Sequence, residues 1–401
     1  MKLIKIPEDK YYDYKLNAMF DCYKWDPQFC DSSTLAKYVL VLTKQENDEI
    51  IKLTKDLDKE TRLAEEYLNK NIKISKKLAL PKKIIEQMPN MQTYDKNQNI
   101  RLMRYDFHPS VDGRWVVTEV NSDVPGGFAE SSLLPELARK TINMPELEYV
   151  SFGEEMVKNI NRLLNKKGII MMVHCTCFSD DRQVMQYLGD RLEKEGYKVI
   201  YGAADHINFK EKQAYCILDN NNVKIDLIFR FTPLEWLIQM KPRRWDGYFN
   251  NITKSCNHPI AIYAQSKRFP LVWNDLENAG ISMKTWRSLS PETLEIKDLG
   301  NKEGFIYKPV YGRVGERISI KEACRGDEYT KIINDVKKHP KQYLAQKKFE
   351  SLPLKGEDSK EYHVCLGAYT IEGEVAGYYA RISKYPRIDS YAADIPVLIE
   401  K

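Results

Sequence analysis

The chain has 401 residues, of which 43% are hydrophobic and 30% are charged, as in an ordinary globular protein. This length allows a large core and two or three subdomains. The net charge of +5 is spread along the chain without a basic tail, which argues against nucleic-acid binding and favours a mild attraction for anionic ligands. The apolar stretches are too short to span a membrane, so no membrane partner is expected.

The N-terminus and the cysteines favour a cytoplasmic protein. Residues 1–7, MetLysLeuIleLysIlePro, lack the apolar core of a signal peptide. The eight cysteines have no repeating spacing, so we expect them to be reduced thiols. HisCysThrCys at 174–177 has residue types that bind zinc, but we interpret it as core packing because it belongs to a buried apolar run.

The first part of the chain is predicted to be mostly helical. Residues 1–45 are rich in Tyr, Phe and Trp and are expected to pack as an N-terminal cap. Residues 46–90 show helical periodicity with many Lys and Glu, which predicts solvated helices interrupted at Pro81. Further helices are predicted over Leu133–Arg139 and Phe152–Lys166.

The middle of the chain alternates strands and helices. The apolar run 168–178 is typical of a strand buried on both faces, and SerAspAsp is predicted to cap a helix over 179–192. The strand Lys198–Tyr201 follows, so these elements are expected to form a parallel β-α-β unit. A hairpin of Ala214–Leu218 and Val223–Phe229, turned by AspAsnAsnAsn, follows, and a strand Leu227–Arg230 is predicted to lead into residues 232–236.

Between these two parts lies the hairpin on which the interpretation of function depends. Its strands are predicted at Leu102–His108 and Arg114–Asn121, joined by a turn over 110–113. The small-residue loop SerAspValProGlyGly at 122–127 follows, where backbone N–H groups can approach an anion.

The hairpin carries four polar side chains whose spacing suggests one patch. Side chains two apart on a strand point the same way, so Arg104 and Asp106 share a face, as do Glu119 and Asn121. If the two faces coincide, their oxygen ligands suit Mg²⁺ bridging phosphates, and the arginine suits a transferring phosphoryl group. The alternative is a solvated hairpin face with an ordinary ion pair.

Two lysines in the C-terminal half are of a kind that holds nucleotide phosphates. Lys267 is predicted to lie at the opening of a helix. Lys308 is predicted to face inward at a strand end, before a loop punctuated by Gly312 and Gly315. Such a loop by itself is more often just a turn. The segment 343–349 predicts a strand and a linker that could contact an adenine edge.

Taken together, these residues resemble the synthetase domain of glutathionylspermidine synthetase, a branch of the ATP-grasp carbon–nitrogen ligases. From about residue 100 onward, blocks of similar sequence occur in the family's order. They are ArgTyrAsp with GluValAsnSerAspValPro in the hairpin, residues 226–237, SerLysArgPhePro at 266–270, TyrLysProValTyrGlyArgValGlyGlu at 307–316, and the segments 345–353 and 373–384. The metal set precedes the two lysines, as in the permuted arrangement of this branch.

The resemblance implies an α+β ATP-grasp fold in the permuted arrangement, with an inserted α/β subdomain similar to a pre-ATP-grasp domain. Three domains are expected on this basis. Residues 1–150 would hold the N-terminal helical segment and the metal-binding hairpin. Residues 151–260 would form the α/β substrate subdomain, and residues 261–401 the nucleotide-binding lobe with its loop and the C-terminal core strands.

The activity implied by the resemblance is ATP-dependent carboxylate–amine ligation. A carboxylate would take the γ-phosphoryl group of ATP, and an amine would then displace phosphate to form an amide, leaving ADP and phosphate. ATP and two Mg²⁺ ions are the implied cofactors. The implied partners are a small-molecule or peptide carboxylate, an amine acceptor and a second copy of the chain in a homodimer. An idle nucleotide-binding scaffold and an ATP-dependent phosphotransferase on the same fold are the alternatives.

The resemblance also implies a role for each matching residue. The implied metal ligands are Asp106, Glu119 and Asn121. The implied catalytic residues are Arg104 and Arg381. The implied ATP-binding residues are Arg104, Lys267, Lys308, Gly312, Arg313, Gly315 and Gln346. The implied substrate-binding residues are Asp180, Asp181, Val124, Gly126 and Glu235.

One departure from the family's pattern and one simpler interpretation limit this transfer. The family's small hydroxyl residues after the metal set are replaced here by Val124, Gly126 and Gly127, which would change the acyl donor that fits. Asp180 and Asp181 fall where relatives carry an acidic pair for a cationic amine, but a helix N-cap explains them as well.

Two further residues near these motifs have structural explanations. Glu235 has two interpretations: it binds substrate, or it forms an ion pair with Arg230 at the end of a strand. His108 follows Asp106 by two residues and could face the patch, although a single histidine near a turn is more often structural.

Overall fold

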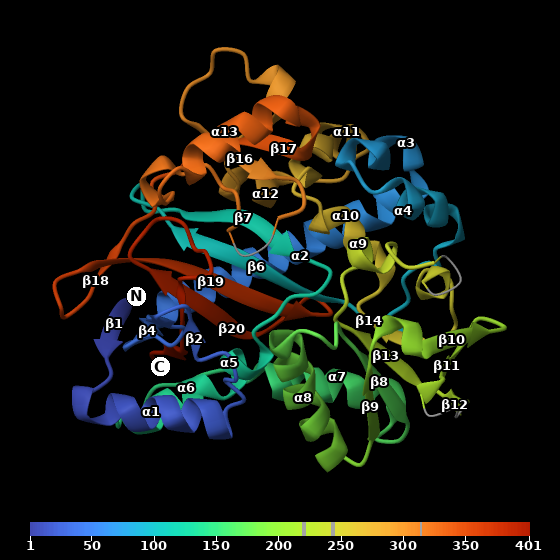
Figure 1. The fold of residues 1–401 in the computed structure, drawn as a ribbon, viewed down its shortest axis with the longest axis horizontal. Helices are drawn as coiled ribbons and strands as arrows, with labels where there is room; N and C mark the ends of the chain where they lie inside the picture. Colours follow the sequence, from blue (N-terminus) through green and yellow to red (C-terminus); the bar gives the residue numbers. More distant parts are fainter. Residues whose placement is uncertain (219–221, 242–244, 313–314) are drawn as a thin grey trace.

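The central sheet of the protein carries the predicted hairpin (Figure 1). The computed structural model describes residues 1–218, 222–241, 245–312 and 315–401. The central sheet is mainly antiparallel, with the strand order β21-β20-β19-β6-β7. Its strands are β6 (Leu102–Pro109), β7 (Trp115–Asn121), β19 (Glu361–Ile371), β20 (Glu374–Ser383) and β21 (Ala393–Ile395), and β18 (Leu354–Lys355) pairs with β19.

One face of the central sheet is covered by the long helix α2 (Lys44–Lys70). Thr43 caps α2 through a reciprocal capping box with Glu46, which fixes where the helix begins. The apolar residues of α2 and the alternate residues of β6 and β7 share one core, formed in part by Ile50, Leu57, Ala64, Leu68, Met103, Tyr105, Phe107 and Val117. The period-2 alternation therefore turns Arg104, Asp106 and His108 toward the opposite face.

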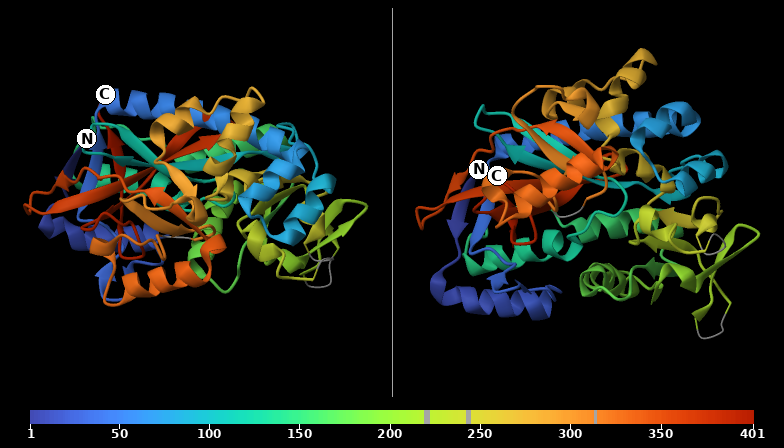
Figure 2. Two further views of the ribbon diagram at one scale, coloured as in Figure 1. Left: turned by 90° about the horizontal axis from the view of Figure 1, so that it is seen from above. Right: turned by 45° about the horizontal axis from the view of Figure 1, so that its top comes forward.

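That opposite face is covered by a smaller sheet with the order β15-β17-β16. Its strands are β15 (Thr293–Glu295), β16 (Phe305–Pro309) and β17 (Tyr343–Lys347), and helix α13 (Glu328–Lys338) packs on it. Seen from above, α2, the central sheet and this smaller sheet form successive layers (Figure 2, left). The predicted strands that carry Lys308 and Gln346 are thereby confirmed.

A parallel sheet with the order β5-β14-β13-β8-β9 forms a separate part of the molecule, at the lower right of Figure 1. Its strands are β5 (Asn99–Ile100), β8 (Ile169–Val173), β9 (Lys198–Gly202), β13 (Leu227–Arg230) and β14 (Lys254–Cys256). Helix α8 (Ser179–Lys194) connects β8 to β9, which confirms the predicted β-α-β unit. Helix α7 (Phe152–Leu164) shares its apolar core with α8 and with residues of the central sheet.

The two ends of the chain meet in a fourth sheet, where β4 (Tyr38–Leu42) lies between β1 (Lys2–Lys5) and β22 (Val397–Ile399). Helices α1 (Glu8–Asp21) and α6 (Leu134–Thr141) pack beside it (Figure 1). The remaining helices include α3 (Ile72–Ser75), α4 (Lys82–Gln87), α5 (Phe128–Ser132), α9 (Leu234–Leu237), α10 (Ile262–Gln265), α11 (Trp273–Asn278) and α12 (Lys284–Leu289). The remaining strands are β2 (Gln28–Phe29), β3 (Ser32–Ser33), β10 (Ile207–Lys210), β11 (Gln213–Cys216) and β12 (Val223–Lys224).

Three local predictions are wrong. SerAspAsp does not cap α8. The helix begins at Ser179, and Phe178 takes the cap position in extended conformation. The Ser179 hydroxyl donates to Asp180 Oδ1 and does not accept a backbone N–H of the first turn. The predicted hairpin strand Val223–Phe229 is too long: β12 ends at Lys224, and the Asp226 carboxylate accepts the backbone N–H of Ile169 at 2.8 Å. The predicted strand Leu227–Arg230 is confirmed as β13.

The HisCysThrCys segment is the third. It lies beyond the end of β8, and only His174 is deeply buried, whereas Cys177 is exposed, so packing inside a strand does not explain it. No group of three or more His, Cys, Asp or Glu side chains suited to a metal occurs among the described residues. All eight cysteines are free thiols, as expected. In the part of the chain that the structure describes, every helix is too short or too polar to cross a bilayer.

Candidate active site

A cavity of about 870 Å³ lies between the central sheet, the β15-β17-β16 sheet and the first turn of α8. Its floor is the polar face of β6 and β7. The first turn of α8 faces it from the carboxyl ends of the parallel strands, where ligands bind in open α/β sheets. The cavity therefore lies where the central sheet, the β15-β17-β16 sheet and the parallel sheet come together.

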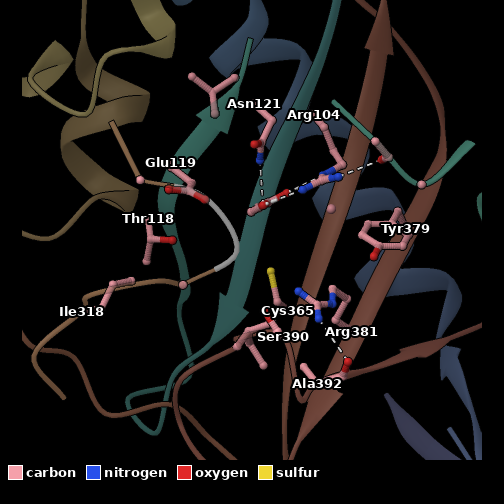
Figure 3. A pocket seen from close by; sticks show the side chains of 18 of the residues that line it. Arg104, Thr118, Glu119, Asn121, Ile318, Cys365, Tyr379, Arg381, Ser390 and Ala392 are labelled. Carbon is pink, nitrogen blue, oxygen red and sulfur yellow. Dashed lines mark hydrogen bonds and ion pairs between the residues drawn. The ribbon is translucent and has the colours of Figure 1, made fainter. Parts of the chain in front are cut away.

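The four polar side chains of the hairpin do meet on one face (Figure 3). Arg104 is paired with Asn121 in the register of the two strands, and Asp106 with Glu119. Two guanidinium nitrogens of Arg104 donate to the two oxygens of Asp106 at 2.8 and 3.0 Å. The Asn121 amide donates to Asp106 Oδ2 at 2.8 Å, which leaves its own oxygen free to accept a ligand.

A β-bulge in β7 enlarges this face. Asp106 pairs with Glu119 but Phe107 pairs with Val117, so Thr118 has no partner in the ladder. As a result, the consecutive side chains of Thr118 and Glu119 both line the cavity (Figure 3). Strict alternation would have turned one of them away.

Lys267 and Lys308 approach the hairpin from the other side of the cavity. Lys267 follows the short helix α10, and its Nζ lies 3.2 Å from Glu119 Oε2 and 2.5 Å from the carbonyl oxygen of Gly312. Lys308 extends from β16, is 6% exposed, and donates to Gln346 Oε1 at 3.1 Å. Both cationic groups therefore meet the acidic patch inside one cavity.

The charges in this part of the cavity change one another's protonation. Burial lowers the pKa of Lys308 to about 8, although the nearby Glu119 carboxylate acts in the opposite direction. Burial would raise the pKa of Glu119, but Lys267 and Lys308 outweigh it and lower that pKa to about 2. Glu119 is therefore a carboxylate across the physiological range.

The loop after β7 is held by groups that lie far away in the sequence. Gln265 Oε1 accepts the backbone N–H groups of Ser122 and Asp123, each at 2.9 Å. The Asp123 carboxylate forms a buried ion pair with Arg230. The carbonyl oxygen of Gly126 accepts Arg104 Nη1 at 2.8 Å, so the loop and the polar patch are fixed together.

The far end of the cavity is acidic. Its acidic lining residues are Asp26, Glu130, Asp180, Asp181 and Asp394. Lys24 is 2% exposed and lies 2.6 Å from Asp394, 2.7 Å from Asp26 and 3.2 Å from Glu130. Burial opposes its charge, but these carboxylates raise the pKa of Lys24 well above its usual value. Lys24 thus offsets only part of the negative charge.

Comparison with known proteins decides the family. A family model described as glutathionylspermidine synthase preATP-grasp matches residues 20–400. The chain belongs to this family. Membership indicates an ATP-dependent ligase and agrees with the mixed α and β architecture of several sheets. A search of curated proteins found no significant match.

Solved structures add a likeness in fold to this member of the glutathionylspermidine synthase family. A glutathione synthetase-like effector from Globodera pallida, in its apo form, is similar with a TM-score of 0.63 and 12% identity, covering 98% of this chain and 97% of that one. A candidate gamma-glutamylcysteine synthetase from Methylobacillus flagellatus is similar with a TM-score of 0.44 and 11% identity, covering 83% of this chain and 86% of that one.

Most of the site residues predicted from the sequence of this chain line the cavity. They are Arg104, Asp106, Glu119, Asn121, Val124, Gly126, Asp180, Asp181, Lys267, Lys308, Gly312, Gly315, Gln346 and Arg381. Glu235, in α9, is not among the described residues that line it, and Arg230 is paired with Asp123. Arg313 lies outside the described residues.

Several cavity residues escaped the sequence analysis. Lys24 and Cys365 lie in segments without a recognisable motif, and Tyr379 is one aromatic residue among many. Thr118 required knowledge of the bulge. His108 was considered: it lines the cavity 3.5 Å from Thr118 Oγ1, and burial lowers its pKa to about 4, so it is neutral at pH 7.

The oxygen groups of the hairpin suit a hard divalent cation. Asp106 and Glu119 supply carboxylates, and Asn121 supplies an amide oxygen. Mg²⁺ commonly binds through one or two carboxylates, with phosphate and water oxygens in its other positions. The donor set therefore fits the metal that accompanies nucleotide phosphates in this type of ligase.

Proposed function

We propose that the protein is an ATP-dependent carboxylate–amine ligase that forms an amide through an acylphosphate. The observation that carries the proposal is the meeting of the Asp106, Glu119 and Asn121 oxygens with the buried amines of Lys267 and Lys308 in one cavity. Opposite charges on the two walls suit a triphosphate and its cations between them.

In this proposal each hairpin residue has a defined task. Asp106, Glu119 and Asn121 hold Mg²⁺, which supplies charge neutralisation on the nucleotide phosphates. Arg104 is kept in place by Asp106 and the Gly126 carbonyl, so its guanidinium is preorganised for charge on the transferring phosphoryl group. Arg381 acts near the reacting carboxylate.

The other wall binds the nucleotide. Lys267 and Lys308 contact phosphate oxygens, and Gln346 meets the adenine. Gly312 and Gly315 bring backbone close to the phosphates, and burial of Lys308 excludes water that would hydrolyse the acylphosphate.

The acidic end of the cavity takes the amine acceptor. The ammonium form of an amine is attracted by Asp180 and Asp181, and by the charge that Lys24 leaves uncompensated on Asp26, Glu130 and Asp394. Val124 and Gly126 contact the acyl donor. Glu235 is not among the described residues that line the cavity, and its role in substrate binding stays a prediction.

The finer architecture is part of the same proposal. The order of the hairpin before both lysines corresponds to the permuted ATP-grasp arrangement. The parallel sheet corresponds to the inserted pre-ATP-grasp-like subdomain over 151–260, between a unit at 1–150 and the nucleotide lobe at 261–401.

The test is Mg²⁺-dependent ADP release over a panel of small peptides and polyamines. We expect release that requires one acid and one amine together, and that is lost in Asp106→Ala and Lys308→Ala. Asp112→Ala removes an exposed carboxylate from the same hairpin and serves as the control. ADP with a stable phosphorylated acid and no amine requirement would favour a phosphotransferase. Nucleotide binding without turnover on any pair would favour a scaffold.

A further inference from the structure

The loop between β20 and β21, residues 384–392, forms one side of the cavity and receives the side chain of Arg381. We call it the β20–β21 loop. Arg381 Nη2 donates to the carbonyl oxygens of Asp389 at 2.7 Å and of Ala392 at 3.0 Å (Figure 3). The Arg381 Nε also lies 3.7 Å from Asp394 Oδ1 of β21, but both hydrogen bonds of its Nη2 go to these loop carbonyls. The loop therefore helps to set the direction of the guanidinium.

Arg387 ties this loop to α13. It is 5% exposed, and its guanidinium donates to the two Glu328 oxygens at 2.8 and 3.0 Å. The same guanidinium donates to Asp389 Oδ2 at 3.0 Å. Glu328 is the first residue of α13, whereas Asp389 is the residue whose carbonyl holds Arg381. One buried arginine therefore links α13 to Asp389, whose carbonyl oxygen accepts from Arg381.

Helix α13 in turn packs on the β15-β17-β16 sheet, which carries Lys308 and Gln346. Ile332 and Val336 of α13 pack on Tyr343 of β17 in a small separate core. β17 carries Gln346 and pairs with β16, which carries Lys308. The position of Lys308 is thus linked to Arg387 through one packed helix and one ion pair.

A second contact brings the same two parts together. Gly315 approaches the loop so closely that a Cβ there would lie 2.3 Å from the carbonyl oxygen of Ile388. Arg325 lies 3.6 Å from Asp389 and stacks 3.4 Å above the ring of Tyr391. The β20–β21 loop is therefore held against the nucleotide wall along its length, with Arg387 as its buried charge-assisted anchor.

We propose that Arg387 is a positioning residue that couples the nucleotide wall to Arg381 through the β20–β21 loop. When the β15-β17-β16 sheet and α13 are in place, Glu328 fixes Arg387, Arg387 fixes Asp389, and the Asp389 carbonyl orients Arg381. The coupling rests on the nucleotide binding of the proposed function, and its catalytic consequence rests on the ligase activity as well. Arg387 itself contacts neither reacting group in this scheme.

The coupling is tested without turnover by hydrogen exchange of the β20–β21 loop, with and without Mg²⁺ and a non-hydrolysable ATP analogue. We expect the analogue to slow exchange of the loop amides in the unmodified protein. This protection should be lost in Arg387→Gln and in Glu328→Gln. Lys331→Gln removes an exposed ion pair of the same helix and should keep it. Equal protection in the unmodified protein and both variants would overturn the proposal.

The catalytic consequence is tested by a double-mutant cycle. We expect Arg387→Gln to lower kcat by about 100-fold, the scale of a small misplacement of a reacting group, with the KM for ATP nearly unchanged. In an Arg381→Ala background the same substitution should have no further effect on kcat. Additive losses would show that Arg387 acts independently of Arg381, and they would overturn the proposal. An unmodified protein that never turns over would overturn the ligase function, while the exchange experiment still decides the coupling.

Discussion

Arg104 and Asp106 lie two residues apart on β6 and hold each other through two hydrogen bonds of 2.8 and 3.0 Å. Asp112 and Arg114, in the turn of the same hairpin, have the same spacing and bonds of 2.9 and 2.6 Å. The side chains of the first pair are 12% and 9% exposed, and those of the second are 65% and 46% exposed. The difference in burial separates a site pair from a surface pair.

The first prediction compares these two pairs. Asp106→Asn should reduce ADP release by about 100-fold or more, because a preorganised charge in a water-poor site is removed. Asp112→Asn should change it by less than about twofold, since exposed ion pairs contribute little. Steady-state kinetics on the two variants measures both effects. A similar loss in both would mean that the buried pair has no special role.

The second prediction concerns Lys308. Lys308→Gln should weaken ATP binding by about 30-fold, because a buried amine facing the phosphates is lost. Lys347→Gln is the matched control, since Lys347 extends from the neighbouring strand and is exposed to solvent. Calorimetric titration with ATP measures the two affinities. Unchanged affinity in Lys308→Gln would remove Lys308 from the nucleotide site.

The third prediction concerns Gly315, whose φ is +65°. Gly315→Ala should lower the free energy of unfolding by about 1 kcal/mol, because alanine is strained in the left-handed conformation. The contact of its Cβ with the Ile388 carbonyl should lower it further, and turnover should fall as well. Gly300→Ala has a similar φ of +55° and open space around its Cβ, so it should lose only the backbone contribution. Thermal unfolding compares the two. Equal losses would contradict a close contact with the β20–β21 loop.

The fourth prediction concerns Asp58, buried between α2 and β19, where Thr370 donates to it at 2.6 Å. Burial raises the pKa of Asp58 to about 6. A raised carboxyl pKa gives the folded state a proton that the unfolded chain releases, so the stabilisation is present at low pH and is lost as pH rises through 6. Relative to Asp58→Asn, the free energy of unfolding should fall by about 1–2 kcal/mol between pH 5 and 8.

Chemical unfolding of both proteins at the two pH values measures this difference, and contributions of other groups cancel in the comparison. Asp56→Asn, an exposed position on the same helix, should show no such trend. A flat difference for Asp58→Asn would mean that its carboxyl titrates as in the unfolded chain.

The sequence was sufficient for the parts of the site that local periodicity determines. Alternation along β6 and β7 placed Arg104, Asp106, Glu119 and Asn121 on one face, and the inward position of Lys308 followed from its strand. The bulge at Thr118 could not be predicted, because it depends on how two strands pair and not on either strand alone.

Other parts depended on partners far away in the chain. Lys24 is an isolated lysine whose carboxylates come from α5 and β21, and Arg387 acquires its role from Glu328. The cap of α8 and the end of the strand that begins at Val223 were predicted wrongly, because side chains there form other hydrogen bonds. Charged residues that act through long-range ion pairs leave no periodic signal in a single sequence.

The sheet in which both chain ends meet has a consequence for biosynthesis. β4 pairs with β22 in parallel register, so Leu40 lies opposite Val397, and Leu42 lies opposite Ile399. A chain leaving the ribosome must carry the apolar β4 strand with one open edge until residues 397–399 have emerged. Pairing of such distant segments slows folding. We therefore expect the nascent protein to need protection from aggregation at this strand, and this sheet to close only after residues 397–399 have been synthesised.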